Sequence, residues 1–268
     1  MTTLNSELLI DSKILRENIS YIKSKLKNQT NFMSVIKSDA YGHNLEFIIK
    51  DIDDISDGYG VVRIEEAIKI RKFSDKKILL MQGVYTDADY QLAKENNLDL
   101  VVHNNDQFSL IRKHNNFNNL WLKVNTGMNR LGLDSNDLDH VLDNISYISS
   151  VNFEFILTHF SNSNNKDDNF NYIQYEKILK LSSYFKKRKI SLSNTGGILL
   201  DKKFILDQTR PGIGIYGYDA NGKNIILYVW YDNEFGYTKQ VIRLAKYVSG
   251  VRRLHYYWIK RYFNFSTT

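Results

Sequence analysis

Eight short apolar runs alternate with helix-length amphipathic stretches along the first 218 residues, and this alternation constrains the fold more than any other feature. The runs are rich in β-branched and aromatic residues and are bounded by turn residues, which predicts strands. They cover residues 34–37, 58–62, 78–82, 98–103, 120–125, 153–159, 190–193 and 209–216, and helical patterns between them include 63–73, 87–96, 134–143 and 169–187. Such alternation predicts an α/β chain folded as a closed parallel (β/α)8 barrel of the TIM type, with a doubly wound open sheet as the alternative.

Composition excludes several classes of protein. The chain has no cysteine, so it forms no disulfide, no cysteine-ligated metal centre and no cysteine nucleophile. The net charge is +6, and residues 219–268 supply most of it with 8 basic and 3 acidic residues. A nearly neutral body gives no reason to expect nucleic acid binding. We find no signal-peptide pattern and no run of about 20 apolar residues, so we expect a cytoplasmic protein without a membrane segment.

Unusual polar residues follow the predicted strands at their carboxyl ends, where active sites of such barrels lie. Lys37 ends the first strand, Lys123 interrupts the fifth, His159 ends the sixth and Arg210 opens the eighth. A lysine with a buried stem has a lowered pKa and suits Schiff-base chemistry, and the glycines of residues 193–197 expose backbone N–H groups to an anion. Each feature alone also fits an ordinary strand end, turn or salt bridge. Together they predict a phosphorylated aldehyde cofactor.

Five motifs carry a resemblance to a known family. They are VIKSDAYGH at residues 35–43, VNTGMNRLG at 124–132, THF at 158–160, SNTGG at 193–197 and RPGIGIYG at 210–217. In this order and spacing they resemble the motifs of alanine racemases over about residues 5–218. The resemblance implies the N-terminal barrel of that family, pyridoxal 5'-phosphate as cofactor, and interconversion of L-alanine and D-alanine for peptidoglycan.

The resemblance also implies roles for individual residues. Lys37 would hold the cofactor covalently and act as the base on the D-side of the substrate. Arg130 would donate a hydrogen bond to the phenolate oxygen of the cofactor ring, and His159 would stack against that ring; these three are the predicted catalytic residues. Arg210 would face the ring nitrogen. Lys123 matches a lysine that many members carbamylate to position Arg130.

The predicted phosphate site draws on three motifs. Tyr41, Asn194, Thr195, Gly212 and Ile213 match the residues that bind the cofactor phosphate in the family. Thr195 departs from the usual serine but keeps the hydroxyl group. No metal ion is implied by the resemblance.

The end of the chain departs from the family. The family's second base is a tyrosine from a β-rich C-terminal domain, which reaches into the partner subunit's site. Only 51 residues follow Gly217. We therefore expect that domain to be missing, which puts the family's homodimer in doubt and leaves the second base unassigned among the 18 tyrosines.

The last segment resembles a different family. IILYVWYDNEFGY at residues 225–237 and VIRLA at 241–245 are similar to the C-terminal strand and helix of glyceraldehyde-3-phosphate dehydrogenase, over about residues 223–255. In that family, the asparagine that matches Asn233 contacts the nicotinamide carboxamide. No dinucleotide-binding domain precedes the segment and the nucleophilic cysteine is absent, so dehydrogenase activity is excluded. The basic aromatic residues 252–265 fit an orphaned tail better than a membrane or nucleic acid surface.

The sequence therefore predicts two parts, a cofactor-binding barrel at residues 1–218 and a dehydrogenase-like fragment at 219–268, joined near Ala220 by a gene fusion or by an artefact that brought two genes together. Three functional hypotheses stay open. The first is an alanine racemase-type enzyme, whose preference for alanine over serine the sequence does not decide. The second is an inactive cofactor-binding barrel akin to pyridoxal-phosphate homeostasis proteins, and the third is a fragment that does not fold.

Overall fold

The computed structural model describes residues 10–114, 119–134, 153–185 and 188–217. All of these residues belong to one compact unit. The predicted dehydrogenase-like tail at residues 219–268, and residues 135–143 of one predicted helix, lie outside the described ranges.

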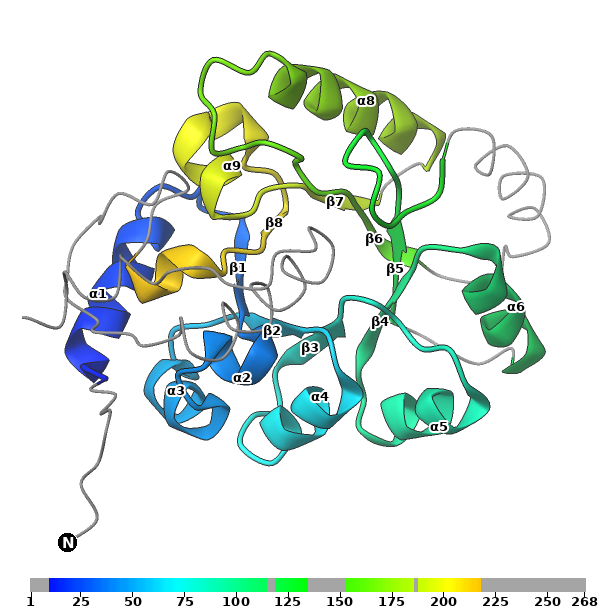
Figure 1. The fold of residues 1–268 in the computed structure, drawn as a ribbon, viewed down its shortest axis with the longest axis horizontal. Coiled ribbons are helices and arrows are strands. Elements are labelled where there is room, and N and C mark those ends of the chain that lie inside the picture. Colours follow the sequence, from blue (N-terminus) through cyan, green and yellow to red (C-terminus); the bar gives the residue numbers. More distant parts are fainter. Residues whose placement is uncertain (1–9, 115–118, 135–152, 186–187, 218–268) are drawn as a thin grey trace, which may run out of the picture. The chain divides into compact units, whose positions relative to one another are not determined.

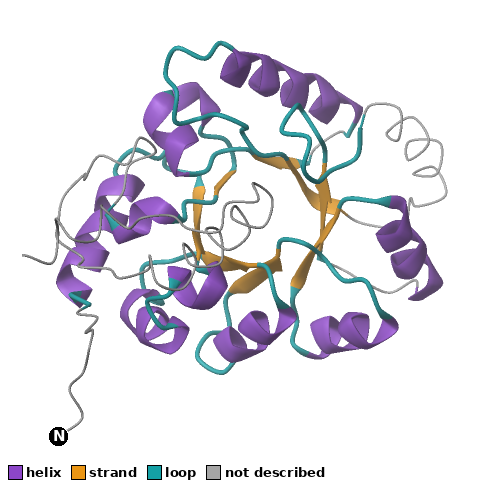
Figure 2. Cartoon of the chain, viewed as in Figure 1, coloured by secondary structure: helices purple, strands orange, loops and turns teal. Residues whose placement is uncertain are grey.

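Eight parallel strands close into a barrel in the order of the sequence. They are β1 (Asn31–Val35), β2 (Gly58–Val61), β3 (Lys77–Leu80), β4 (Asp99–Val102), β5 (Leu120–Lys123), β6 (Phe153–Leu157), β7 (Lys189–Ser191) and β8 (Gln208–Thr209). Closure comes from pairing of β1 with β8, in which Asn31 lies opposite Gln208. Figure 2 shows the strands as an inner ring with the helices outside it. The predicted (β/α)8 barrel is confirmed, and the open-sheet alternative is excluded.

Helices follow most strands and cover the outside of the barrel (Figure 1). They are α1 (Ser12–Lys23), α2 (Lys37–Tyr41), α3 (Leu45–Ile52), α4 (Ile64–Arg71), α5 (Asp87–Glu95), α6 (Asn105–His114), α8 (Phe170–Tyr184) and α9 (Thr195–Leu200), with 3-10 turns η1 (Lys202–Phe204) and η2 (Ile213–Tyr216). Within the described part of the chain, none of these helices is long and apolar enough to cross a bilayer.

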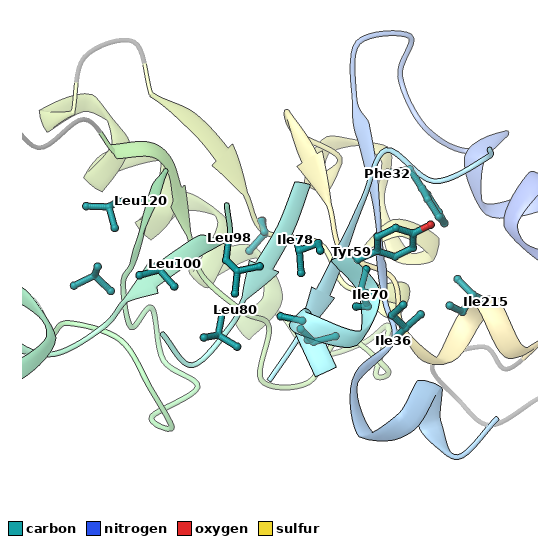
Figure 3. Packing of buried hydrophobic residues seen from close by; sticks show 14 of the residues in the cluster. Phe32, Ile36, Tyr59, Ile70, Ile78, Leu80, Leu98, Leu100, Leu120 and Ile215 are labelled. Carbon is teal, nitrogen blue, oxygen red and sulfur yellow. The ribbon is translucent and has the colours of Figure 1, made fainter. Parts of the chain in front are cut away.

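Side chains on the strands alternate between two apolar layers, as the period of two in a strand requires. The outward layer lies between strands and helices and includes Phe32, Tyr59 and Leu100 (Figure 3). The inward layer fills the barrel with Met33, Leu79, Val101, Trp121, Phe155 and Leu157. The rings of Trp121 and Phe155 stack with their centroids 3.9 Å apart. The barrel is therefore a packed core, with its ends available for polar groups.

The strands end earlier than the sequence patterns predict. β1 ends at Val35, so Lys37 lies two residues beyond it and begins α2. The prediction of a long eighth strand was wrong, because β8 has only two residues and Gly212 turns the chain at φ −120° and ψ −84°. The N–H groups of Gly212 and Gly214 donate hydrogen bonds to the Thr195 hydroxyl rather than to a neighbouring strand. The helix predicted at residues 87–96 begins at Asp87, and Thr86 caps it, since Thr86 Oγ1 accepts from the Asp89 N–H at 3.1 Å.

Candidate functional site

A cavity of about 560 Å³ lies at the carboxyl ends of the strands. Its floor is formed by Val35, Met81, Lys123 and Leu157, at or just beyond the ends of β1, β3, β5 and β6. All ten site residues predicted from the sequence line this one cavity: Lys37, Tyr41, Lys123, Arg130, His159, Asn194, Thr195, Arg210, Gly212 and Ile213. Segments up to 176 residues apart in the sequence therefore meet at one site because the barrel closes.

Lys37 opens a turn with unusual backbone geometry. Ser38, Asp39, Ala40 and Tyr41 all have φ between 53° and 57°, so the chain makes one left-handed helical turn. Left-handed helical geometry costs an L-residue about 1–2 kcal/mol, and none of these four is glycine. The turn is stabilised by the N–H of Leu45, which donates to Asp39 Oδ1 at 3.0 Å, and by burial of the Ala40 methyl group. Strain of this kind persists only where the surrounding structure over-determines it, which occurs most often at functional sites.

The amine of Lys37 is half-buried at the cavity wall. Burial lowers its pKa, and the nearby Arg130 guanidinium lowers it further, whereas the carboxylate of Glu66 opposes them. A larger share of Lys37 is therefore unprotonated near neutral pH than for an exposed lysine. An unprotonated amine is the form that attacks an aldehyde.

Lys123 points into the barrel one layer above Trp121 on β5. Its side chain is 7% exposed, which is rare for lysine. Burial, followed by the charges of Arg210, Arg130 and Lys37, lowers its pKa to about 8. Lys123 is thus partly neutral at physiological pH.

Arg210 is buried immediately after β8. Its guanidinium donates to the carbonyl of Thr158 at 2.6 Å and to the hydroxyl of Ser191. Burial lowers the pKa of Arg210 to about 10, so it stays charged at neutral pH. Among the described residues that line the cavity there are four Lys and Arg side chains and no aspartate or glutamate. The cavity therefore attracts anions.

His159 follows β6 and is half-buried at the cavity wall. Burial first, and then the positive charges of Arg210 and Lys123, hold its pKa well below the ordinary value. The ring is therefore neutral at pH 7. Its backbone carbonyl accepts a hydrogen bond from Gln174 Nε2 at 3.1 Å.

Hydrogen bonds between side chains and backbone N–H groups hold the side of the cavity near β7 and β8. Asn194 caps α9 by accepting from the N–H of Gly197 at 2.9 Å, and Ser163 Oγ donates to the same Asn194 oxygen at 2.8 Å. Thr195 Oγ1 accepts from the N–H groups of Gly212 and Gly214. These bonds fix the loop after β8 against the start of α9.

Tyr41, at the end of α2, lies against the loop after β8 on the same side of the cavity. A Cβ atom at Gly212 would lie 2.2 Å from Tyr41 Oη, so this glycine is required for the close approach of the two segments. Burial raises the pKa of Tyr41 to about 12, so its hydroxyl is a hydrogen-bond donor rather than a base at neutral pH.

Two residues that support the site were not among those predicted. Gln174 on α8 is fully buried and bonds to the N–H of Ser161 and to Thr126 Oγ1, as well as to His159. Glu66 on α4 bonds to the turn that follows Lys37. Both are polar residues among other polar residues of their helices, and a sequence pattern does not distinguish them from solvent-exposed side chains. Over the described ranges, no group of three His, Cys, Asp or Glu side chains is arranged to hold a metal ion.

The matching family model is "Alanine racemase, N-terminal domain", and it covers residues 10–220. The chain is similar to the alanine racemase of Mannheimia succiniciproducens, with 34% identity over 211 residues, which cover 78% of this chain and 58% of that protein. It is similar to the alanine racemase of Haemophilus influenzae, with 30% identity over 91% of this chain and 66% of that one. The chain thus spans less than two thirds of the length of these relatives.

Solved structures give the same result. The biosynthetic alanine racemase of Pseudomonas aeruginosa matches with a TM-score of 0.73 and 28% identity, over 79% of this chain and 59% of that one. The alanine racemase of Bartonella henselae, solved with covalently bound pyridoxal phosphate, matches with a TM-score of 0.73 and 25% identity, over 81% of this chain and 64% of that one. The chain is a member of the alanine racemase N-terminal domain family.

Proposed function

We propose that this chain binds pyridoxal 5'-phosphate in the cavity and acts as an alanine racemase-type enzyme that interconverts L-alanine and D-alanine. One observation carries the proposal: two lysines, two arginines and the polar loops after β7 and β8 line a single cavity, and its described lining holds no carboxylate. Such a site suits a ligand that carries a phosphate and an aldehyde.

The residues of the cavity fit this cofactor on three grounds. The cavity has the size of sites for ligands of this class. Gly212 lets the Tyr41 hydroxyl approach the backbone of the loop after β8, where a Cβ would lie 2.2 Å from Oη. Arg210 is buried without a carboxylate partner among the described residues, so a cation remains to face the ligand.

When bound, pyridoxal phosphate supplies an electron sink that makes the α-proton of an amino acid removable. Lys37 would hold the cofactor covalently and move that proton on one face, since its lowered pKa keeps the amine partly unprotonated. Arg210 stays charged at neutral pH and would face the ring nitrogen, where its charge would disfavour protonation. Asn194, Thr195, Gly212, Ile213 and Tyr41 would hold the phosphate, His159 would stack as a neutral ring, and Lys123, once carbamylated, would position Arg130.

Racemisation needs a base on each face of the substrate. Tyr41 is the tyrosine of the described cavity lining, and its raised pKa makes it a poor base near pH 7. The second base would therefore come from outside the described lining. This observation favours a second candidate function, a barrel that binds the cofactor without turnover.

Three further statements belong to the proposal. We infer two parts, a barrel at residues 1–218 and a separate segment at 219–268 that resembles the end of a dehydrogenase. We infer a cytoplasmic protein that uses alanine and supplies D-alanine for peptidoglycan. Nucleic acid is not a proposed partner, because the charge of residues 1–218 is nearly balanced.

The test is to add pyridoxal phosphate to the full chain and measure D-alanine formed from L-alanine, with Lys37→Ala as the comparison. We expect D-alanine from the unmodified chain and none from the variant. Lys203→Ala is a matched control, since Lys203 is not among the described residues that line the cavity and its ammonium lies over the ring of Tyr172. A chain that forms a borohydride-stable adduct at Lys37 but no D-alanine would support the non-catalytic candidate instead.

A further inference from the structure

Most of the contacts that hold the turn after Lys37 lie within residues 36–45, and one involves Tyr216. Asp39 Oδ1 accepts from Leu45 N–H, and the carbonyl of Ala40 accepts from His43 Nδ1 at 2.9 Å. The ring of His43 in turn stacks on that of Tyr216, with centroids 4.3 Å apart. The N–H of Ala40 also donates to the carbonyl of Ile36 at 3.0 Å, which closes the turn around Lys37. The N–H of Asp39, by contrast, has its partner on a residue from another element.

Glu66 is that residue. It occupies the third position of α4, and its Oε2 accepts from the backbone N–H groups of Val62 and Arg63 at 3.3 and 3.1 Å, which is half of a capping box. Its other oxygen, Oε1, accepts from the N–H of Asp39 at 3.2 Å. One carboxylate therefore joins the start of α4 to the second residue after Lys37.

Glu66 also differs in charge from the other groups that act on Lys37. The cavity groups that interact electrostatically with Lys37 are Arg130, Lys123 and His159. The positive charge of Lys37 lowers the pKa of both Lys123 and His159. Burial lowers the pKa of Lys37, Arg130 lowers it further, and Glu66 raises it. Within the described part of the chain, Glu66 is the anion that offsets the positive charge around this amine.

We propose that Glu66 is a positioning residue that ties the left-handed turn of Lys37 to α4 through the Asp39 N–H and places a negative charge beside the segment that carries the Lys37 amine. The proposal rests on the role of Lys37 in the proposed function. It assigns Glu66 no contact with substrate or cofactor.

The test measures the reactivity of the Lys37 amine in the full chain without cofactor. Trace acetylation across pH 6–11, followed by peptide mass spectrometry, gives two quantities for Lys37: the midpoint of its titration and the labelling rate at the high-pH plateau. The midpoint reports the charges around the amine, and the plateau reports its accessibility. Hydrogen exchange of the Asp39 amide is measured on the same proteins.

Four variants separate the roles. Glu66→Gln removes the charge and keeps one of the two acceptor oxygens, so we expect a midpoint at lower pH and an Asp39 exchange rate between those of the unmodified chain and Glu66→Ala. Glu66→Asp keeps the charge on a shorter side chain, so we expect a nearly unchanged midpoint and faster exchange at Asp39. Glu66→Ala should show both changes. Glu65→Gln, an exposed neighbour in the same first turn of α4, is the control and should leave both quantities unchanged.

An unchanged midpoint in Glu66→Gln would overturn the electrostatic part, and an unchanged Asp39 exchange rate in Glu66→Ala would overturn the positioning part. If Glu66→Ala fails to fold, the Gln and Asp variants still decide both parts. Because no cofactor is present, these readouts do not depend on whether the chain binds pyridoxal phosphate. Failure of cofactor binding by the unmodified chain would count against the proposed function alone.

Discussion

At the scale of single residues, Lys123 is the side chain whose surroundings most alter its chemistry. Only a neutral amine adds carbon dioxide, and with a pKa of about 8 roughly half of Lys123 is neutral at pH 8, far more than for an ordinary lysine. A carbamate would also place a negative charge beside Arg130, Arg210 and Lys37, which the cavity favours. We therefore predict a carbamate signal in 13C NMR of the chain in labelled bicarbonate at pH 8. Lys123→Arg keeps the positive charge and should abolish that signal; its persistence in the variant would refute the assignment.

Gly212 tests the close packing of the proposed phosphate site. A methyl group there would lie 2.2 Å from Tyr41 Oη, so Gly212→Ala must displace the tyrosine or the loop after β8. We expect the affinity for pyridoxal phosphate, measured by fluorescence titration, to fall by at least about tenfold, which corresponds to about 1.4 kcal/mol. Adding Tyr41→Phe removes the clashing oxygen and should recover part of the loss relative to Gly212→Ala alone. Unchanged affinity in Gly212→Ala would show that the cofactor binds elsewhere.

The motifs predicted which residues meet in the cavity but not how their backbones are arranged. All ten predicted residues line one cavity, because each motif follows a strand and the strands close in order. Glu66 and Gln174 were missed because their partners, the Asp39 N–H and the His159 carbonyl, are backbone groups that any sequence provides. Patterns of residue types detect reactive side chains more readily than the residues that hold them.

At the scale of elements, the left-handed turn of α2 has a cost that substitution can measure. Ser38 is exposed and has φ 56°, a region that β-branched residues adopt with difficulty. We predict that Ser38→Val lowers the free energy of unfolding by about 1–2 kcal/mol, whereas Ser38→Gly does not. Ser20→Val, at an exposed position of the ordinary right-handed helix α1, should cost well under 1 kcal/mol and controls for the change of side chain. Equal losses at the two positions in urea denaturation would contradict the turn geometry.

The amino end of β4 carries a buried carboxylate that makes stability depend on pH. Asp99 is 1% exposed and accepts from Trp121 Nε1 at 2.9 Å. Burial raises its pKa to about 6, against the attraction of Lys77. The folded chain therefore binds this proton more tightly than the unfolded chain, so the contribution is present below about pH 4 and is lost as pH rises through 6.

We predict that Asp99→Asn, which keeps an acceptor for Trp121, gains stability relative to the unmodified chain by up to about 3 kcal/mol between pH 4 and pH 7. The measurement is the difference in urea unfolding free energy at each pH. Asp106→Asn removes an exposed carboxylate in α6 and should show a much smaller pH dependence. A constant difference between Asp99→Asn and the unmodified chain over this range would contradict the buried state of the carboxylate.

Element types were predictable from the sequence, and element ends were less so. The apolar runs identified all eight strands, since each needs only alternation and flanking turns. The run after Arg210 was predicted as strand because its isoleucines alternate with glycines, but Gly212 and Gly214 donate to Thr195 instead. The turn after Lys37 was not predicted, because Ser, Ala and Tyr carry no local signal for positive φ and the single Asp39 carries only a weak one.

At the scale of the whole molecule, an anionic cofactor that binds only the folded chain must stabilise it. At a free concentration 100 times its dissociation constant, pyridoxal phosphate should add about 2.7 kcal/mol, which raises Tm by about 5–10 °C. Pyridoxal lacks the phosphate and should give a much smaller shift at the same concentration. Equal shifts for the two compounds in a thermal melt would contradict the phosphate site.

The central claim is that Lys37 is the amine that holds the cofactor. The most direct measurement is to incubate the full chain with one equivalent of pyridoxal phosphate, reduce it with borohydride, and locate the pyridoxyl group by peptide mass spectrometry. We predict a single dominant adduct on the peptide that contains Lys37, lost in Lys37→Ala. An adduct spread over exposed lysines, or one that persists in Lys37→Ala at the same yield, would contradict the claim.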